Sequence, residues 1–215
     1  MIDLIAITDH PGPPLPGSLS LRAVPVDGLT AVCAPAERED ATVDALWRRE
    51  ETIEALMADR DLLPVRYGTR LEDDAAAARA VTERRAELGA ALDRVRGAVE
   101  LSLRVIAADD PDEARAADET GGRMRSGADY IRAKACLVAR RDAGARTLHE
   151  PLSTLARASV KRPPRPPLEL LRVAYLVDRP AVEGFTALVA RAQRSSPGLR
   201  LLLTGPWPPY SFAER

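Results

Sequence analysis

Residues 98–107, AVELSLRVIA, alternate strictly between apolar and polar side chains, and no other stretch constrains the fold as strongly. In an extended chain, successive side chains point to opposite faces. One face of this segment carries Val99, Leu101, Leu103 and Val105. We expect a β-strand that buries this face in a core.

The segments that follow this strand predict an alternation of helix and strand. In chain order they are a helix over 126–158, a strand over 168–178, a helix that starts at Pro180 and a strand over 199–204. Pro151 is expected to kink the first helix, and the proline run that ends it can only be extended. This order of elements over 97–205 is close to a ferredoxin-like α+β sandwich that lacks one strand.

The first 96 residues predict a separate α+β unit. A strand at 1–8 precedes a loop rich in Pro and Gly. Residues 21–35 predict a hairpin, because Asp27-Gly28 supplies the positive φ angles of a tight turn. The expected fold class is α+β, with an N-terminal domain over 1–96 and a ferredoxin-like C-terminal domain over 97–215.

Two amphipathic helices complete the expected N-terminal domain. The first, over 40–59, has Asp40 as its expected N-cap, and the second, over 74–96, ends at Gly97 as a C′ residue. On the first helix, we expect one apolar stripe to face the core: Val43, Leu46, Trp47, Ile53, Leu56 and Met57.

Charge and hydropathy exclude several classes of protein. Lys and Arg total 31 against 32 Asp and Glu, so a net charge of −1 gives no general attraction to nucleic acid or an anionic membrane. There is no apolar run long enough for a membrane span, and the start lacks the pattern of a signal peptide. We therefore expect a cytoplasmic protein that binds neither nucleic acid nor membrane.

The residues that usually carry catalysis are scarce. The chain has two His, with His10 in a proline-rich loop and His149 in a helical segment. Cys33 and Cys136 lie outside any metal or redox spacing, and the acidic segment 108–122 lacks the spacing of cation ligands. Nucleophile elbows, phosphate-binding loops and dinucleotide fingerprints are absent from the sequence. We expect an interaction protein with no enzymatic activity, no metal and no cofactor.

The stretch LLPVRYGT places Arg66 among apolar neighbours and just before Gly68. A guanidinium drawn into the interior needs carboxylate or carbonyl partners for its donors. We expect Arg66 to be at least partly buried in an internal pairing that joins the two N-terminal helices to the sheet. The alternative is that Arg66 binds a partner protein.

Aromatic residues are concentrated near the end of the chain, in TGPWPPYSF at 204–212. This stretch holds Trp207, Tyr210 and Phe212, although the whole chain has only two Trp, four Tyr and two Phe. Prolines hold the backbone extended, and the aromatic side chains need a surface to bury. We expect the segment to fold back on the C-terminal domain with Trp207 as its main anchor. The alternative is an aromatic anchor for a partner.

Both stretches resemble motifs of the gas vesicle protein F/L family. LLPVRYGT is similar to the family's Pro-Val-Arg-Phe-Gly-Thr motif, with Tyr67 where Phe is commoner, and GPWPPYSF matches a terminal motif that is very specific. GAVELSLRV resembles a further family segment through Gly97, Glu100 and Arg104. The resemblance covers residues 40–213, and the first strand is compatible with it.

The resemblance implies an accessory or minor structural protein of gas vesicle formation, associated with the vesicle in the cytoplasm. Its implied partners are the small hydrophobic shell protein, gas vesicle shell protein A, and other gas vesicle accessory proteins. The implied partner-binding or structural residues are Pro64, Arg66, Tyr67, Gly68, Gly205, Pro206, Trp207, Pro208, Tyr210 and Phe212. The alternative is a regulatory protein that senses a small molecule with its ferredoxin-like domain.

Overall fold

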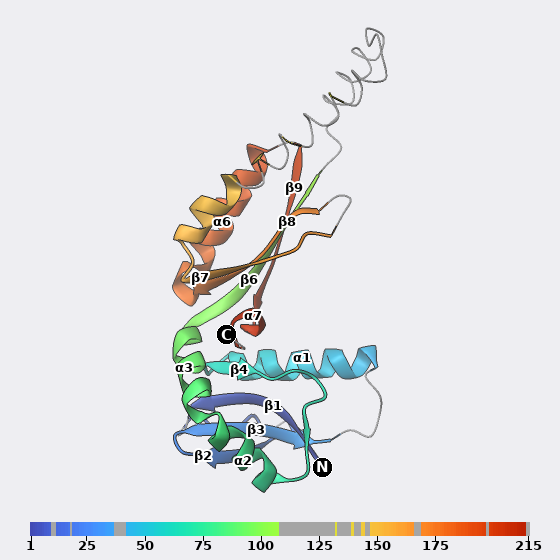
Figure 1. Ribbon diagram of the computed structural model, residues 1–215, viewed down its shortest axis with the longest axis vertical. Coiled ribbons are helices and arrows are strands. Elements are labelled where there is room, and N and C mark those ends of the chain that lie inside the picture. The colour runs from blue at the N-terminus through green and yellow to red at the C-terminus, as the bar shows by residue number, and fades with distance from the viewer. Residues whose placement is uncertain are drawn as a thin grey trace. The chain divides into compact units, whose positions relative to one another are not determined.

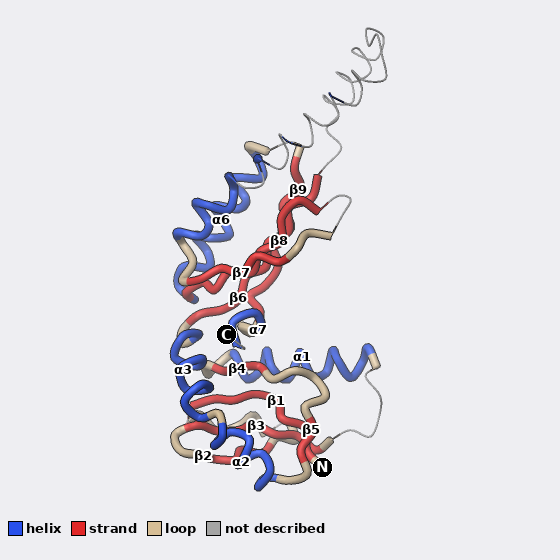
Figure 2. Tube along the Cα trace, in the orientation of Figure 1, coloured by secondary structure: helices blue, strands red, loops and turns tan. Residues whose placement is uncertain are grey.

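The computed structural model describes residues 1–9, 12–17, 19–36, 42–107, 132, 139, 143–144, 147–165, 169–196 and 198–213. It has mixed helices and strands, which confirms the expected α+β class (Figures 1 and 2). The chain forms two compact units. Unit 1 comprises Met1–Glu100 together with Pro206–Arg215, and unit 2 comprises Leu101–Gly205.

Some expectations lie outside the described residues. They concern His10, Asp40, Cys136, the acidic segment 108–122 and most of the helix over 126–158.

Unit 1 is built on one sheet whose strands run in the order β2-β3-β1-β4, with β5 also paired to β1. The strands are β1 (Ile2–Asp9), β2 (Arg22–Val26), β3 (Leu29–Pro35), β4 (Leu62–Pro64) and β5 (Arg70–Leu71). The hairpin between β2 and β3 is confirmed. Its two turn residues, Asp27 and Gly28, have φ angles of 45° and 87°, as the Asp-Gly pair predicts.

The helices of unit 1 differ in several respects from the expectation. They are α1 (Val43–Met57), α2 (Asp74–Glu83), α3 (Arg85–Val95) and the short α7 (Tyr210–Ala213). Thr42 caps α1, because its hydroxyl accepts from the N–H of Ala45 at 3.2 Å. The single helix expected over 74–96 is wrong: Arg84, with φ −114° and ψ 16°, separates α2 from α3.

The break at Arg84 has a packing reason. α2 contacts β2 and β3, whereas α3 contacts β1 and β4, so one straight helix would not cover both parts of the sheet. Gly97, after the end of α3, has a φ of 68°, which confirms it as the expected C′ residue.

The single apolar stripe expected on α1 is also wrong. Ile53 and Leu56 are fully buried, but Val43, Leu46 and Trp47 are 68%, 45% and 63% exposed. At about 100° of rotation per residue, Ala45, Arg49, Ile53 and Leu56 share the side that faces the sheet. Residues 43, 46 and 47 project from a different side of the helix, so α1 carries two apolar stripes.

Unit 2 contains the strand that the sequence pattern lacked. Its sheet has the order β7-β8-β6-β9, with β6 (Ala98–Ala107), β7 (Ala158–Arg162), β8 (Glu169–Asp178) and β9 (Leu199–Trp207). β7 pairs antiparallel with β8 through Val160 and Ala174. The expected helix up to 158 is therefore wrong at its end, because helix is found only to residue 154. Val160 is the one buried apolar residue of β7, which leaves little periodicity to detect.

A helical segment at 147–154 precedes β7, and α6 (Val182–Arg194) lies in the chain between β8 and β9. Together with the strand order, these helices give the ferredoxin-like arrangement. A short 3-10 helix, η1 (Arg179–Ala181), leads into α6. The core of unit 2 joins Leu101, Leu103 and Val105 of β6 to Tyr175 and Phe185. The expected buried face of 98–107 is thus confirmed. Within the part of the chain that is described, no helix has the length and apolar character needed to cross a membrane.

Candidate functional site

The two motif stretches meet in unit 1. Residues 62–69 supply β4 and the loop after it, and residues 206–213 supply α7, which contacts β4 and lies beside it in Figure 1. Pro64, Arg66 and Ala213, drawn from both stretches, line one cavity of about 410 Å³. We call residues 62–69 and 206–213 together the motif junction.

The loop from β4 to β5 is a tight turn closed by the main chain of Arg66. The Arg66 carbonyl accepts from the N–H of Thr69 at 3.3 Å and from the Thr69 hydroxyl at 2.8 Å. Gly68 has a φ of 79°, a conformation that favours glycine. Pro64 is buried, but the Arg66 residue is exposed. The expectation of a buried Arg66 is therefore wrong.

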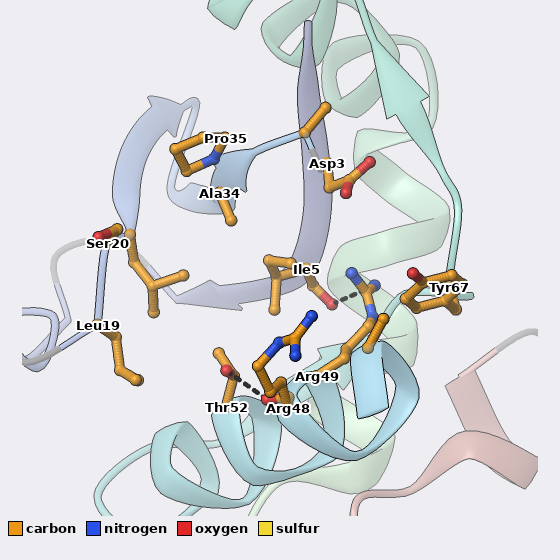
Figure 3. Close-up of a pocket in the computed structure, with 13 residues that line it drawn as sticks. Asp3, Ile5, Leu19, Ser20, Ala34, Pro35, Arg48, Arg49, Thr52 and Tyr67 are labelled. Atoms are coloured by element: carbon orange, nitrogen blue, oxygen red, sulfur yellow. Dashed lines mark hydrogen bonds between the residues drawn. The ribbon is translucent and has the colours of Figure 1, made fainter. Parts of the chain in front are cut away.

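The arginine that enters the interior is Arg49 of α1, which is 9% exposed. Its Nη2 donates to the carbonyl of Val65 at 2.7 Å and to the carbonyl of Leu4 at 2.9 Å. Figure 3 shows the guanidinium directed at β1, between Ile5 and the Tyr67 ring. The guanidinium carbon lies 5.8 Å from the centre of that ring.

A gap in the sheet explains the position of Arg49. β1 pairs with β4 from Ala6 onward and with β5 only up to Asp3, and on its other side the pairing of β1 with β3 has a register irregularity between Leu4 and Ala6. Carbonyls in such a gap need donors from elsewhere. Arg49 supplies them, and its burial lowers its pKa from the ordinary value. The helical spacing of the sequence could have predicted that Arg49 is buried, because Arg49 falls on the same side of α1 as Ala45, Ile53 and Leu56.

Arg49 borders a cavity of about 340 Å³ between α1 and the sheet, shown in Figure 3. Asp3, Arg48, Thr52 and Tyr67 contribute its polar lining. Because Arg49 donates to main-chain carbonyls, we assign it to holding β1 and the β4–β5 loop together rather than to a ligand.

The terminal motif packs in unit 1, so its expected attachment to the C-terminal domain is wrong. α7 contacts α3 and β4. The anchor also differs from the expectation: Phe212 is 3% exposed and Pro208 and Pro209 are buried, whereas Trp207 is only half-buried. Trp207 is the last residue of β9, and the prolines after it lead into the turn of α7 that buries Phe212.

Side-chain hydrogen bonds hold α7 in place, including one from Arg94 to the carbonyl of Phe212 at 3.3 Å. The Glu100 carboxylate, in a residue that is 8% exposed, accepts from the N–H and the hydroxyl of Ser211 at 2.7 and 2.8 Å. The Tyr210 hydroxyl donates to Glu50 of α1 at 2.9 Å. Burial of the hydroxyl, together with the nearby Glu50 carboxylate, raises the pKa of Tyr210. Gly205 and Pro206, before the anchored part, are exposed.

The residues of GAVELSLRV that matched the family also have structural partners. The N–H of Gly97 donates to Asp61 at 2.9 Å, and Arg104 donates to Glu169 at 2.6 Å. Glu169 is buried, which disfavours its charge, but hydrogen bonds from Arg104 and from the Arg165 N–H hold its pKa below the ordinary value. Each position therefore stabilises one of the two units.

Two further candidate chemical groups, Cys33 and His149, lie in the part of the chain that the structure describes, and both contact the interior of the fold. Burial, with a contribution from Asp74, raises the pKa of the Cys33 thiol to about 11. His149 Nδ1 lies 2.8 Å from the hydroxyl of Tyr175, a core residue, and burial lowers the pKa of His149. Across the described ranges, His, Cys, Asp and Glu side chains do not form a group of three or more that could hold a metal ion.

Comparison with known proteins matches this arrangement to one family. Residues 5–214 match the model of the family described as gas vesicle synthesis protein GvpL/GvpF. Gas vesicle protein L of Streptomyces sp. (strain CB03234) is 36% identical over 199 residues, which cover 84% of this chain and 73% of that protein. Gas vesicle protein F of the same strain is 29% identical over 238 residues, covering 98% and 97%.

Two crystal structures share the fold. One is GvpF from Microcystis aeruginosa, with a TM-score of 0.77, 18% identity and coverage of 100% of this chain and 99% of that chain. The other is GvpF from Anabaena sp. PCC7120, with a TM-score of 0.80, 18% identity and coverage of 100% and 96%.

Proposed function

The chain belongs to the gas vesicle synthesis protein GvpL/GvpF family, and on that premise we propose that it binds the small hydrophobic shell protein during vesicle assembly. A role related to gas vesicles follows from the family itself. The finer proposal is that the protein is an accessory or minor structural component, that it acts in the cytoplasm at the vesicle and that it has no catalytic step.

One observation carries this proposal: the family match extends from residue 5 to 214 and so includes the whole motif junction. In the structure, polar groups of that junction make internal contacts, such as the hydrogen bonds from Ser211 to the Glu100 carboxylate. Internal contacts of this kind support a scaffold that presents surfaces, rather than a site that transforms a substrate.

We assign the shell contact to the exposed end of β9, residues 204–206. Thr204, Gly205 and Pro206 are exposed, and β9 is the last strand in the order of its sheet. An edge strand offers main-chain donors and acceptors to another chain. The half-buried Trp207, directly after this stretch, adds apolar area that would suit a hydrophobic partner.

The test captures the tagged full chain from cells that form gas vesicles and probes the eluate for the shell protein. We expect capture by the parent and by Ser159→Glu, an exposed position on β7 at the opposite edge of the sheet. We expect Thr204→Glu to capture much less, because the added charge must be desolvated in an apolar contact. Absence of the shell protein from the parent's eluate would reject the proposal.

A second measurement separates the two forms of the proposal. Isolated vesicles are washed with urea and probed for the protein. Retention after the wash identifies a minor structural component, whereas loss identifies an assembly factor.

A further inference from the structure

The outer side of α1 carries an apolar patch that the fold leaves open. Val43, Leu46 and Trp47 are 68%, 45% and 63% exposed. Isolated exposed aliphatic residues are common, but an exposed Trp beside two aliphatic residues on adjacent turns of one helix is a recognisable interaction surface. We call the surface formed by Val43, Leu46, Trp47, Glu50 and Glu54 the outer face of α1.

This face points away from the cavity between α1 and the sheet. Ala45, Arg48, Arg49 and Thr52 line that cavity and mark the inner side of the helix (Figure 3). Helical spacing places residues 43, 47, 50 and 54 within about one quarter of the helix circumference, on the other side. The patch is therefore distinct from the core of unit 1.

The terminal motif extends the outer face. Tyr210 is 37% exposed, and its hydroxyl donates to Glu50 at 2.9 Å. Glu50 lies one turn after both Leu46 and Trp47 on the helix. The surface therefore joins apolar area from α1 to an aromatic side chain from α7.

On this face and along its border formed by Asp44 and Glu51, the charged side chains of α1 are negative, and the exposed Arg48 lies beyond that border. Glu50 and Glu54 lie on the face, and Asp44 and Glu51 lie along one border by helical spacing. The two arginines of the helix, Arg48 and Arg49, line the cavity on the inner side. A second copy of the chain that docked through the same face would bring carboxylates against carboxylates, which is unfavourable.

We propose that the outer face of α1 binds an amphipathic helix of a partner protein, with aliphatic residues on its apolar stripe and Lys or Arg along the borders. Aliphatic side chains spaced over two turns would cover Val43, Leu46 and Trp47. The flanking cations would meet Glu50, Glu51 and Glu54. This surface is formed by α1 and α7 of unit 1, and its test does not depend on the assignment of the shell contact to β9.

The probe is a synthetic helical peptide of about 14 residues, four turns long, made of Leu and Lys at amphipathic spacing. The comparison peptide has the same spacing with Glu in place of Lys. Binding of each labelled peptide to the full chain is measured by fluorescence anisotropy. We expect the Leu/Lys peptide to bind at least about tenfold more tightly than the Leu/Glu peptide.

Substitutions on the outer face locate the binding. The Leu46→Ser, Trp47→Ser double variant should weaken binding of the Leu/Lys peptide by about tenfold or more. Leu155→Ser is the matched control, because Leu155 of unit 2 is also 45% exposed, and it should leave binding unchanged. All three side chains are exposed, so thermal unfolding should show that both variants remain folded.

Charge reversal tests the chemistry of the partner. Glu51→Lys with Glu54→Lys should reduce binding of the Leu/Lys peptide and increase binding of the Leu/Glu peptide. Equal binding of both peptides by the parent, or no effect of the Leu46 and Trp47 changes, would overturn the proposal. Concentration-dependent dimers that Trp47→Ser abolishes would also overturn it, since the occupant would then be a second copy.

Discussion

Glu100 accepts hydrogen bonds from both the main-chain N–H and the hydroxyl of Ser211, at 2.7 and 2.8 Å, although 111 residues separate the two in sequence. The carboxylate belongs to a residue that is 8% exposed, so its charge depends on such donors. The pair joins the terminal motif to the first residues of β6 inside unit 1.

Ser211→Ala should lower the free energy of unfolding by about 1.5–3 kcal/mol, because it removes one donor to a buried carboxylate. Urea denaturation followed by circular dichroism measures the loss. Ser195→Ala is the control, since the Ser195 hydroxyl is exposed and donates to carbonyls of its own helix. Equal losses in the two variants would show that Glu100 does not depend on Ser211.

Arg49→Met should destabilise the protein by about 2 kcal/mol or more, because it leaves the buried carbonyl of Leu4 and the part-buried carbonyl of Val65 without this donor. Arg66→Met makes the same change at an exposed position of the motif and should stay within about 0.5 kcal/mol of the parent. Urea denaturation of the parent and of both variants measures the two changes. If Arg66→Met proved the more harmful change, the assignment of Arg49 as the interior arginine would be wrong.

Phe212→Ala should cost about 3–5 kcal/mol, since Phe212 is 3% exposed and its removal leaves a cavity between α7, α3 and β4. Trp207→Ala should cost less, because Trp207 is half-buried. Chemical denaturation of both variants gives the order of the two losses. The opposite order would restore Trp207 as the main anchor of the terminal motif.

Local patterns were sufficient for elements whose signal lies within a few residues. The alternation of 98–107 predicted β6 with its buried face, and Asp27-Gly28 predicted the hairpin. Such patterns predict that one side of a strand is buried. They do not predict which of the two units a segment packs against, so the sequence placed the terminal motif on the C-terminal domain although α7 packs in unit 1.

The errors at Arg66 and on α1 share one physical cause. Apolar neighbours along the chain suggested that Arg66 was buried, but its side chain projects from a turn, and the gap in the sheet is filled from α1 by Arg49. Likewise, hydrophobic residues of α1 fall on two sides of the helix, and only the side that packs against the sheet is buried. Both outcomes depend on contacts between segments far apart in sequence.

Unit 2 should lose stability as the pH falls from 7 to 5, and His149 is the group responsible. Burial, with a smaller contribution from Lys161, lowers the pKa of His149 below its ordinary value of 6.5. The folded state therefore favours the neutral ring, which can accept from the Tyr175 hydroxyl at Nδ1. In the unfolded chain the ring takes up a proton near pH 6.5, so stability present above that pH is lost as the pH falls toward the lower folded pKa.

His149→Asn keeps an acceptor near the position of Nδ1 but does not titrate, and its melting temperature should depend less on pH over this interval than the parent's. Thermal unfolding at pH 7, 6 and 5 makes the comparison, and identical pH dependence in the two proteins would exclude His149 as the titrating group.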